Sequence, residues 1–141
     1  METKQEVEQK NRPAFIKVSE EDEGGRIVAI QYGYQVYVGD KKESDGYFYY
    51  YIPSFNIHFF AKTEDEGEKK ANAVMTSFFN YWVKNQGKKA FFDEITRLGF
   101  IKVKSKAKNK KDIRFNILKP NIPPAYKKPF SSFNKVLNIA A

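Results

Sequence analysis

The sequence predicts an α+β fold: a mostly antiparallel β-meander, one long amphipathic helix packed on it, a second short helix and a C-terminal β-hairpin. Three observations lead to this prediction. Residues 47–61 are dense in aromatic side chains, which favour strands. Residues 71–83 repeat apolar side chains at helical spacing. Residues 100–104 and 113–118 alternate apolar and polar side chains, as the strands of a half-buried hairpin do.

The N-terminal part predicts a hairpin followed by another strand. Residues 14–18 and 26–31 form the two strands of the hairpin, and the acidic stretch between them ends in a Gly24-Gly25 turn. Gly33 then separates the hairpin from a third strand over residues 34–38. With the two aromatic strands that follow, the meander has up to five strands.

The aromatic strands cover residues 47–52 and 55–61, with a tight turn at Pro53-Ser54 between them. Tyr47, Tyr49 and Tyr51 share one face of the first strand, because side chains alternate along a strand. This arrangement has two interpretations. Either both faces are buried by the helix or the tail, or one aromatic face stays accessible to a base, a protein partner or a second copy.

A helix is predicted to begin at Thr63. Thr63 and Glu66 have the spacing of a capping box, and the acidic first turn suits the positive end of the helix dipole. The apolar stripe is a core face or, in part, a partner surface; its members are Ala71, Val74, Met75, Phe78, Phe79, Trp82 and Val83. Gly87 is the expected C-terminal stop.

A second helix over residues 89–98 should end at Gly99, and a hairpin should follow it. These elements complete a single domain over residues 13–118, preceded by a flexible polar arm over residues 1–12. Residues 119–141 are expected to form an extended tail, because their prolines exclude a regular helix and a central strand. Its expected anchors are Phe130, Phe133, Val136 and Leu137.

One segment resembles a known family. It runs Asp45-Gly46-Tyr-Phe-Tyr-Tyr-Tyr-Ile-Pro53-Ser-Phe55, and a short strand and Thr63-x-x-Glu66 follow, with Ala71 in the helix. Over residues 34–86 the chain resembles the HicB antitoxin family. The resemblance implies a partial ribonuclease-H-like β-β-β-α-β fold without nuclease chemistry, in a protein that neutralises a small ribonuclease toxin. At Asn56-Ile57-His58 the chain departs from the family, which usually carries a Gly-centred turn and a small or thiol residue there.

Charge divides the chain into two unlike parts. Residues 1–83 have 10 Lys and Arg against 14 Asp and Glu, a net charge of −4, whereas residues 84–141 have 15 against 3, a net charge of +12. A strongly basic half points to an anionic partner, most often nucleic acid. The alternative is a solvated lysine-rich surface that serves solubility.

The residue types argue against an enzyme. His58 is the single histidine and there is no cysteine, so neither a thiolate metal site nor a nucleophile relay can be assembled from them. The predicted strands supply tyrosine, phenylalanine, valine and isoleucine where a ribonuclease-H-type site needs carboxylates. No glycine-rich phosphate loop is present. We therefore expect neither catalytic residues nor a cofactor or metal, and a structural or partner-facing role for His58.

Two function classes follow. The first is a non-enzymatic HicB-like binding protein that neutralises a toxin and contacts DNA or RNA through its basic half, although no helix-turn-helix or ribbon-helix-helix segment follows the core. The second is a stand-alone DNA- or RNA-binding module that uses the basic hairpin and an aromatic sheet face. Predicted nucleic-acid contacts are Arg97, Lys102, Lys104, Lys106, Lys108, Lys110, Lys111 and Arg114. Predicted partner contacts are Tyr47, Tyr49, Tyr51 and His58.

The expected location is the cytoplasm. No apolar run approaches the roughly 20 residues of a membrane span, and the polar start lacks the hydrophobic stretch of a signal peptide. A homodimer is compatible with the sequence, because the outer strands of the sheet need covering.

Overall fold

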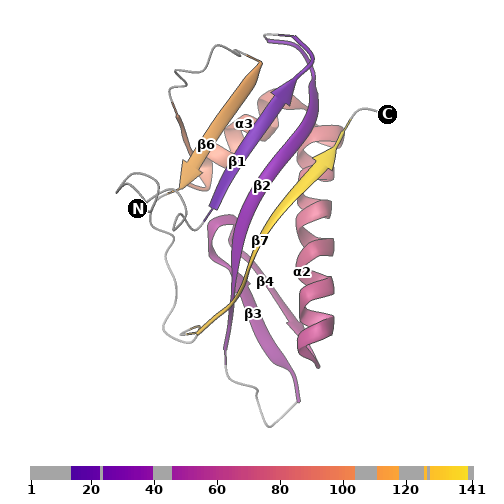
Figure 1. Cartoon of the computed structure of the whole chain (residues 1–141), viewed down its shortest axis with the longest axis vertical. Coiled ribbons are helices and arrows are strands. Elements are labelled where there is room, and N and C mark those ends of the chain that lie inside the picture. The colour runs from indigo at the N-terminus through magenta and orange to yellow at the C-terminus, as the bar shows by residue number, and fades with distance from the viewer. Residues whose placement is uncertain are drawn as a thin grey trace, which may run out of the picture.

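The computed structural model describes residues 14–22, 24–39, 46–103, 111–117, 126 and 128–139. These residues form a seven-stranded antiparallel sheet with a long and a short helix on one face, which confirms the α+β class (Figure 1). The predicted N-terminal arm lies outside the described residues. The elements are β1 (Ala14–Glu20), β2 (Ile27–Val38), β3 (Phe48–Ile52), the 3-10 turn η1 (Pro53–Phe55), β4 (Ile57–Ala61), α2 (Glu64–Phe79), its π-helical continuation η2 (Asn80–Gln86), α3 (Lys88–Arg97), β5 (Ile101–Lys102), β6 (Asp112–Ile117) and β7 (Lys128–Asn138).

Strand β2 is the centre of the sheet. Its partner β7 pairs with it from Ala29 to Val38. β1 pairs with the first part of β2 and β3 with its last two residues, so these two strands share the edge of β2 that β7 leaves free. Outward from them lie β6 and β5 on one side and β4 on the other. The predicted meander β2–β3–β4 and the C-terminal hairpin β5–β6 are both present.

The predicted break at Gly33 is wrong, since β2 is one continuous strand of 12 residues. Gly33 pairs with Phe15 of β1, and a Cβ at Gly33 would lie 2.5 Å from Cε1 of the Phe15 ring. The glycine therefore makes room for an aromatic ring from the neighbouring strand. A glycine inside a strand often marks such a close approach.

Part of the expected extended tail is a strand of the sheet, since β7 adds 11 residues to it. The prolines of the tail predict that it is not a central strand, and Pro129 lies within β7. The pairing with β2 shifts register between Val36 and Tyr37, and Pro129 lies opposite Tyr37 at this irregularity. Proline is tolerated at bulges and on strands with one unpaired edge, and β2 is the one strand with which β7 pairs among the described residues. Residues 119–125, 127, 140 and 141 of the predicted tail lie outside the described residues.

The aromatic strands are slightly shorter than predicted. β4 begins at Ile57, because the chain makes the 3-10 turn η1 first and then passes through Asn56 at φ 52°. Asparagine is one of the few residues that tolerate this left-handed conformation. Phe55, predicted as a strand residue, belongs to η1, where its side chain is buried in the core.

The long helix begins as predicted. Thr63 Oγ1 accepts a hydrogen bond from the Glu66 amide at 3.1 Å, which is the first half of a capping box. The Glu66 carboxylate accepts from the Lys62 amide at 3.1 Å, one residue before the cap. Gly87 and Gly99 have positive φ at the ends of η2 and α3, so both predicted helix stops are confirmed.

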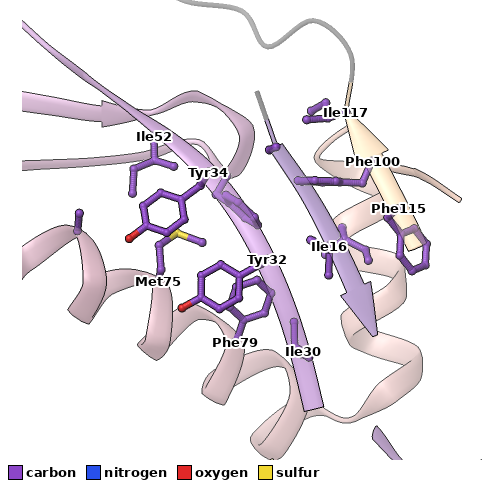
Figure 2. Packing of buried hydrophobic residues seen from close by; sticks show 14 of the residues in the cluster. Ile16, Ile30, Tyr32, Tyr34, Ile52, Met75, Phe79, Phe100, Phe115 and Ile117 are labelled. Atoms are coloured by element: carbon purple, nitrogen blue, oxygen red, sulfur yellow. The ribbon is translucent and has the colours of Figure 1, made fainter. Parts of the chain in front are cut away.

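The core lies between the sheet and the two helices. Tyr32 and Tyr34 of β2 point toward Met75 and Phe79 of α2, and the Tyr32 and Phe79 ring centroids are 4.4 Å apart (Figure 2). Ile16, Phe100 and Phe115 belong to the same buried cluster (Figure 2). The apolar stripe of the long helix packs in the core, which agrees with the interpretation of the stripe as a core face.

Gly67 lets α2 approach β3 closely. A Cβ at this position would lie 2.6 Å from the Tyr50 ring carbon Cζ and 2.7 Å from its hydroxyl oxygen. Tyr50 itself is fully buried beneath the helix. This contact decides which face of β3 the helix covers, and therefore which aromatic side chains of the strand remain on the other face.

Candidate functional site

The sheet face that points away from α2 and α3 is the candidate site, and we call it the outer face. Tyr50 and Phe59 form a cross-strand pair on the helix side, with their rings stacked at 5.1 Å. The next pair, Tyr51 and His58, therefore points outward, because successive side chains of a strand alternate. In the aromatic part of the chain the outer face carries Tyr47, Tyr49, Tyr51, His58 and Phe60.

Three of these rings form a cluster that we call the Phe60 cluster, made of Tyr47, Tyr49 and Phe60. The Tyr47 ring meets Phe60 edge to face at 5.0 Å, and the Tyr49 ring lies 6.1 Å from it. Phe60 is 50% exposed, which is high for a large apolar side chain. The half-exposed Phe60 ring offers a flat apolar surface to a ligand that carries rings of its own.

Two lysines lie over this cluster. Lys62 Nζ is 5.4 Å from the centroid of the Tyr47 ring, and Lys70 Nζ is 5.2 Å from that of Phe60. Both distances are within the range of a cation–π interaction. Lys62 comes directly after β4 and Lys70 from α2, so the helix contributes a cation to the sheet surface.

The positive charge here is partly balanced. Lys70 Nζ donates to the Phe60 carbonyl oxygen at 2.8 Å and forms an ion pair with Glu66 at 3.4 Å. The pKa of Glu66 is lowered, first by the hydrogen bond from the Lys62 amide and also by Lys70. The charge of Lys62 also lowers the pKa of Glu66, so both lysines act on this carboxylate.

A second aromatic group lies next to the Phe60 cluster. The Tyr51 and His58 rings stack at 4.2 Å, and the Tyr126 ring lies 5.3 Å from Tyr51 and 5.9 Å from His58. The Tyr126 hydroxyl is 3.4 Å from His58 Nδ1. Burial raises the pKa of Tyr51, and Tyr126 adds to that effect. Tyr51 is only 6% exposed, so this group is more covered than the Phe60 cluster.

The outer face continues onto β1 and β6 with another cation over a ring. The Arg114 guanidinium lies 4.5 Å from the centroid of Phe15, whose ring covers Gly33. Arg114 Nε also donates to Asn116 at 3.1 Å. Lys17 pairs with Asp112 at 3.6 Å on the same face. Arginine over phenylalanine thus repeats, at the other end of the sheet, the pairing of lysine with aromatic rings.

The predicted basic residues are spread over different sides of the molecule. Lys102 pairs with buried Phe115 and so points to the helix side of the hairpin, whereas Arg114 points outward. Arg97 on α3 is tied to Glu94 by a hydrogen bond of 2.8 Å, which raises its pKa. Lys111 is exposed in the turn before β6. Lys104, Lys106, Lys108 and Lys110 lie outside the described residues.

An apolar hollow of about 410 Å³ opens on the helix side of the β5–β6 hairpin. Its lining is mostly aromatic and aliphatic, with Lys102 among the residues around it. Ile101 is 63% exposed there. The lining residues are Phe92, Thr96, Phe100, Ile101, Lys102 and Phe115.

A buried ion pair fixes the turn between β1 and β2. Lys88, the first residue of α3, pairs with the Glu20 carboxylate, whose side chain is 2% exposed. Lys88 Nζ also donates to the Gly25 carbonyl at 2.7 Å, and the Gly24 amide donates to Glu20 at 3.2 Å. The two contacts of Lys88 hold the turn against the helix start, and the contact between Gly24 and Glu20 lies within the turn. We therefore assign this ion pair a structural role.

Within the described ranges, no group of three or more histidine, cysteine, aspartate or glutamate side chains is arranged to hold a metal ion. No helix in this part of the chain combines the length and apolar character that crossing a membrane requires.

The structure brings the predicted partner contacts together. Tyr47, Tyr49, Tyr51 and His58 all lie on the outer face. Sequence reasoning missed Phe60, Lys62 and Lys70. Alternation along the predicted strand places Phe60 on the same face as His58, so the sequence was sufficient to predict the position of Phe60. No sequence pattern predicts the position of Lys70, because its place over Phe60 depends on how α2 crosses the sheet.

Comparison with known proteins gives no match: no family model, no curated protein and no solved structure is similar to this chain.

Proposed function

We propose that this chain is a non-enzymatic protein that binds nucleic acid on the outer face of its sheet. One observation supports the proposal above others: aromatic rings on that face, among them the half-exposed Phe60, lie under cations. Lys62 and Lys70 accompany the Phe60 cluster, and Arg114 accompanies Phe15. Aromatic rings stack on bases and cations contact phosphates, which is the combination used by proteins that bind single strands.

Charge supports the same ligand. The chain carries a net charge of +8 at pH 7, with the excess in residues 84–141. Phosphate contacts give affinity that falls steeply with salt but do not read sequence. The proposal therefore expects tight binding at low salt and little preference among sequences.

The test is the binding of fluorescently labelled DNA and RNA oligonucleotides, followed by anisotropy across a salt series. Phe60→Ala should weaken binding about tenfold, since stacking of one base contributes roughly 1–3 kcal/mol. Lys62→Ala should reduce the slope of log affinity against log salt by about 1.

The chain offers matched controls on the helix side. Tyr81 is 48% exposed, a fraction similar to the 50% of Phe60. Lys89 is an exposed lysine of α3. Tyr81→Ala and Lys89→Ala should leave affinity unchanged. Equal losses from the helix-side and outer-face variants would refute a site on the outer face, and no binding by the wild type at low salt would refute nucleic-acid binding as a whole.

A second function, neutralisation of a small ribonuclease toxin by a HicB-like protein, is supported by the order of elements. β2, β3 and β4 pair in sequence and α2 follows, which is the order expected from the resemblance over residues 34–86. The test adds the protein, in equimolar amounts, to a small ribonuclease toxin of the kind that HicB antitoxins neutralise. Loss of RNA cleavage together with a stable complex on size exclusion would support this role, and unchanged cleavage would refute it.

A homodimer is also part of this proposal. β7 pairs with β2 alone among the described strands, so its other edge has backbone groups that a second copy can pair with. Light scattering coupled to size exclusion measures the mass directly. A mass near the 16.4 kDa of one chain would refute the dimer.

A further inference from the structure

The aromatic pairs of β3 and β4 form two adjacent positions on the outer face. Tyr49 pairs with Phe60, and Tyr51 pairs with His58 two residues further along the strand. Strands rise about 3.3–3.4 Å per residue, so the two positions are about 7 Å apart. The first position is exposed at Phe60, and the second is covered by Tyr126.

The spacing of about 7 Å between the two positions favours a single strand over a duplex. Stacked bases in a duplex follow one another at about 3.4 Å along each strand. Two neighbouring bases that each stack on one of these positions must therefore separate from one another. Only a single strand can do this at low cost, because its bases are free to splay apart onto protein rings.

The contacts of Tyr126 show that a ring fits against the second position, tilted by 40° to the Tyr51 ring and by 55° to the His58 ring. The Tyr126 ring lies against both Tyr51 and His58, and its hydroxyl is within 3.4 Å of His58 Nδ1. A nucleobase has the same flat π face, and it carries donors and acceptors at its edge where tyrosine carries the hydroxyl. Tyr126 thus occupies the place that a base would take.

We infer that the outer face binds an unstacked single strand with two adjacent bases, and that Tyr126 occupies the second base position in the free protein. The inference rests on the proposed nucleic-acid binding and adds to it the class of ligand and a competing side chain. A ligand base must displace Tyr126 before it can pack against Tyr51 and His58. The apparent affinity is the intrinsic affinity multiplied by the fraction of molecules in which Tyr126 has left the position.

The experiment compares a labelled ten-residue thymidine oligonucleotide with a labelled duplex of equal length, by anisotropy at low salt. Thymidine avoids self-structure. The wild type should bind the single strand at least about tenfold more tightly than the duplex. Tyr126→Ala should bind the single strand about threefold more tightly than the wild type and leave duplex binding unchanged.

Two further variants separate competition from other effects. Tyr126→Phe keeps the ring and should keep wild-type affinity to within about twofold. Phe60→Ala removes the exposed position and should weaken single-strand binding about tenfold in the presence or absence of Tyr126. Tyr126 lies outside every described helix and strand, so its substitution should leave the circular dichroism spectrum unchanged.

The outcomes distinguish the inference from the proposed function. Equal affinity for single strand and duplex, or an unchanged or weaker affinity of Tyr126→Ala, would overturn the inference and leave nucleic-acid binding in place. In the case of weaker affinity, Tyr126 would be a ligand contact rather than a competitor. If the wild type binds neither oligonucleotide, the proposed function and the inference both fail.

Discussion

The two faces of the sheet place the same residue type in opposite environments. Tyr32, Tyr34 and Tyr50 are buried against α2, while Tyr47 and Tyr49 lie on the outer face around a half-exposed phenylalanine. Burial raises the pKa of each of the three inner tyrosines. Neighbouring tyrosines such as Tyr49 and Tyr50 thus lie on opposite faces of one strand. The position of α2 decides which of them is buried.

The largest expected effect is the removal of a ring from the buried face, measured against the removal of a ring from the outer face. Phe79 is fully buried and contacts Tyr32 and Phe91, so Phe79→Ala should lower the free energy of unfolding by about 3–5 kcal/mol. Phe60→Ala should cost less than about 1 kcal/mol, because half of its surface already faces solvent. Urea unfolding followed by the fluorescence of Trp82, the single tryptophan, measures both.

Phe79→Ala can unfold the chain altogether, since native domains are stable by about 5–15 kcal/mol. Phe79→Leu is the milder variant and should still cost more than Phe60→Leu. Equal costs for the two positions would mean that the outer face is packed like a core, and the contrast between the faces would be lost.

A smaller loss of stability is expected from a substitution of Gly33, because the Phe15 ring on the outer face occupies the space that a side chain at position 33 would need. Gly33→Ala places a Cβ within 2.5 Å of the Phe15 ring and should cost about 1–3 kcal/mol in the same unfolding assay. Phe15→Ala removes the ring that the new methyl group meets. In the double variant the cost of Gly33→Ala should largely disappear, which a double-mutant cycle measures. Additive losses would show that Phe15 does not set the requirement for glycine.

The smallest effect at neutral pH is expected from Tyr34. Its hydroxyl is buried with no hydrogen-bond partner among the described residues, so Tyr34→Phe should change stability at pH 7 by less than about 0.5 kcal/mol. The pKa of Tyr34 is raised above its ordinary value of 10 by burial, then by Tyr32 and Glu68.

The sign of the alkaline effect follows from this shift. Tyr34 ionises more readily in the unfolded chain, so stability is present below pH 10 and is lost as the pH rises above it. Tyr34→Phe should therefore reduce the loss of stability between about pH 10 and pH 12, measured by urea unfolding at a series of pH values. An unchanged pH dependence would show that Tyr34 is not shielded by the helix.

The sequence by itself determined the α+β class, the long capped helix and the glycine stops, because these depend on local spacing and on backbone conformations that few residues accept. It also placed Tyr47, Tyr49 and Tyr51 on one face, since alternation along a strand is a local property, whereas His58 joins them through the pairing of β3 with β4. Tertiary structure decided the rest. Gly33 and Pro129 have breaker propensities that pairing with β1 and β2 overrode, through the Phe15 ring and the register shift. The place of Lys70 over Phe60 and of Tyr126 over Tyr51 depends on contacts between residues far apart in the chain, which no local pattern encodes.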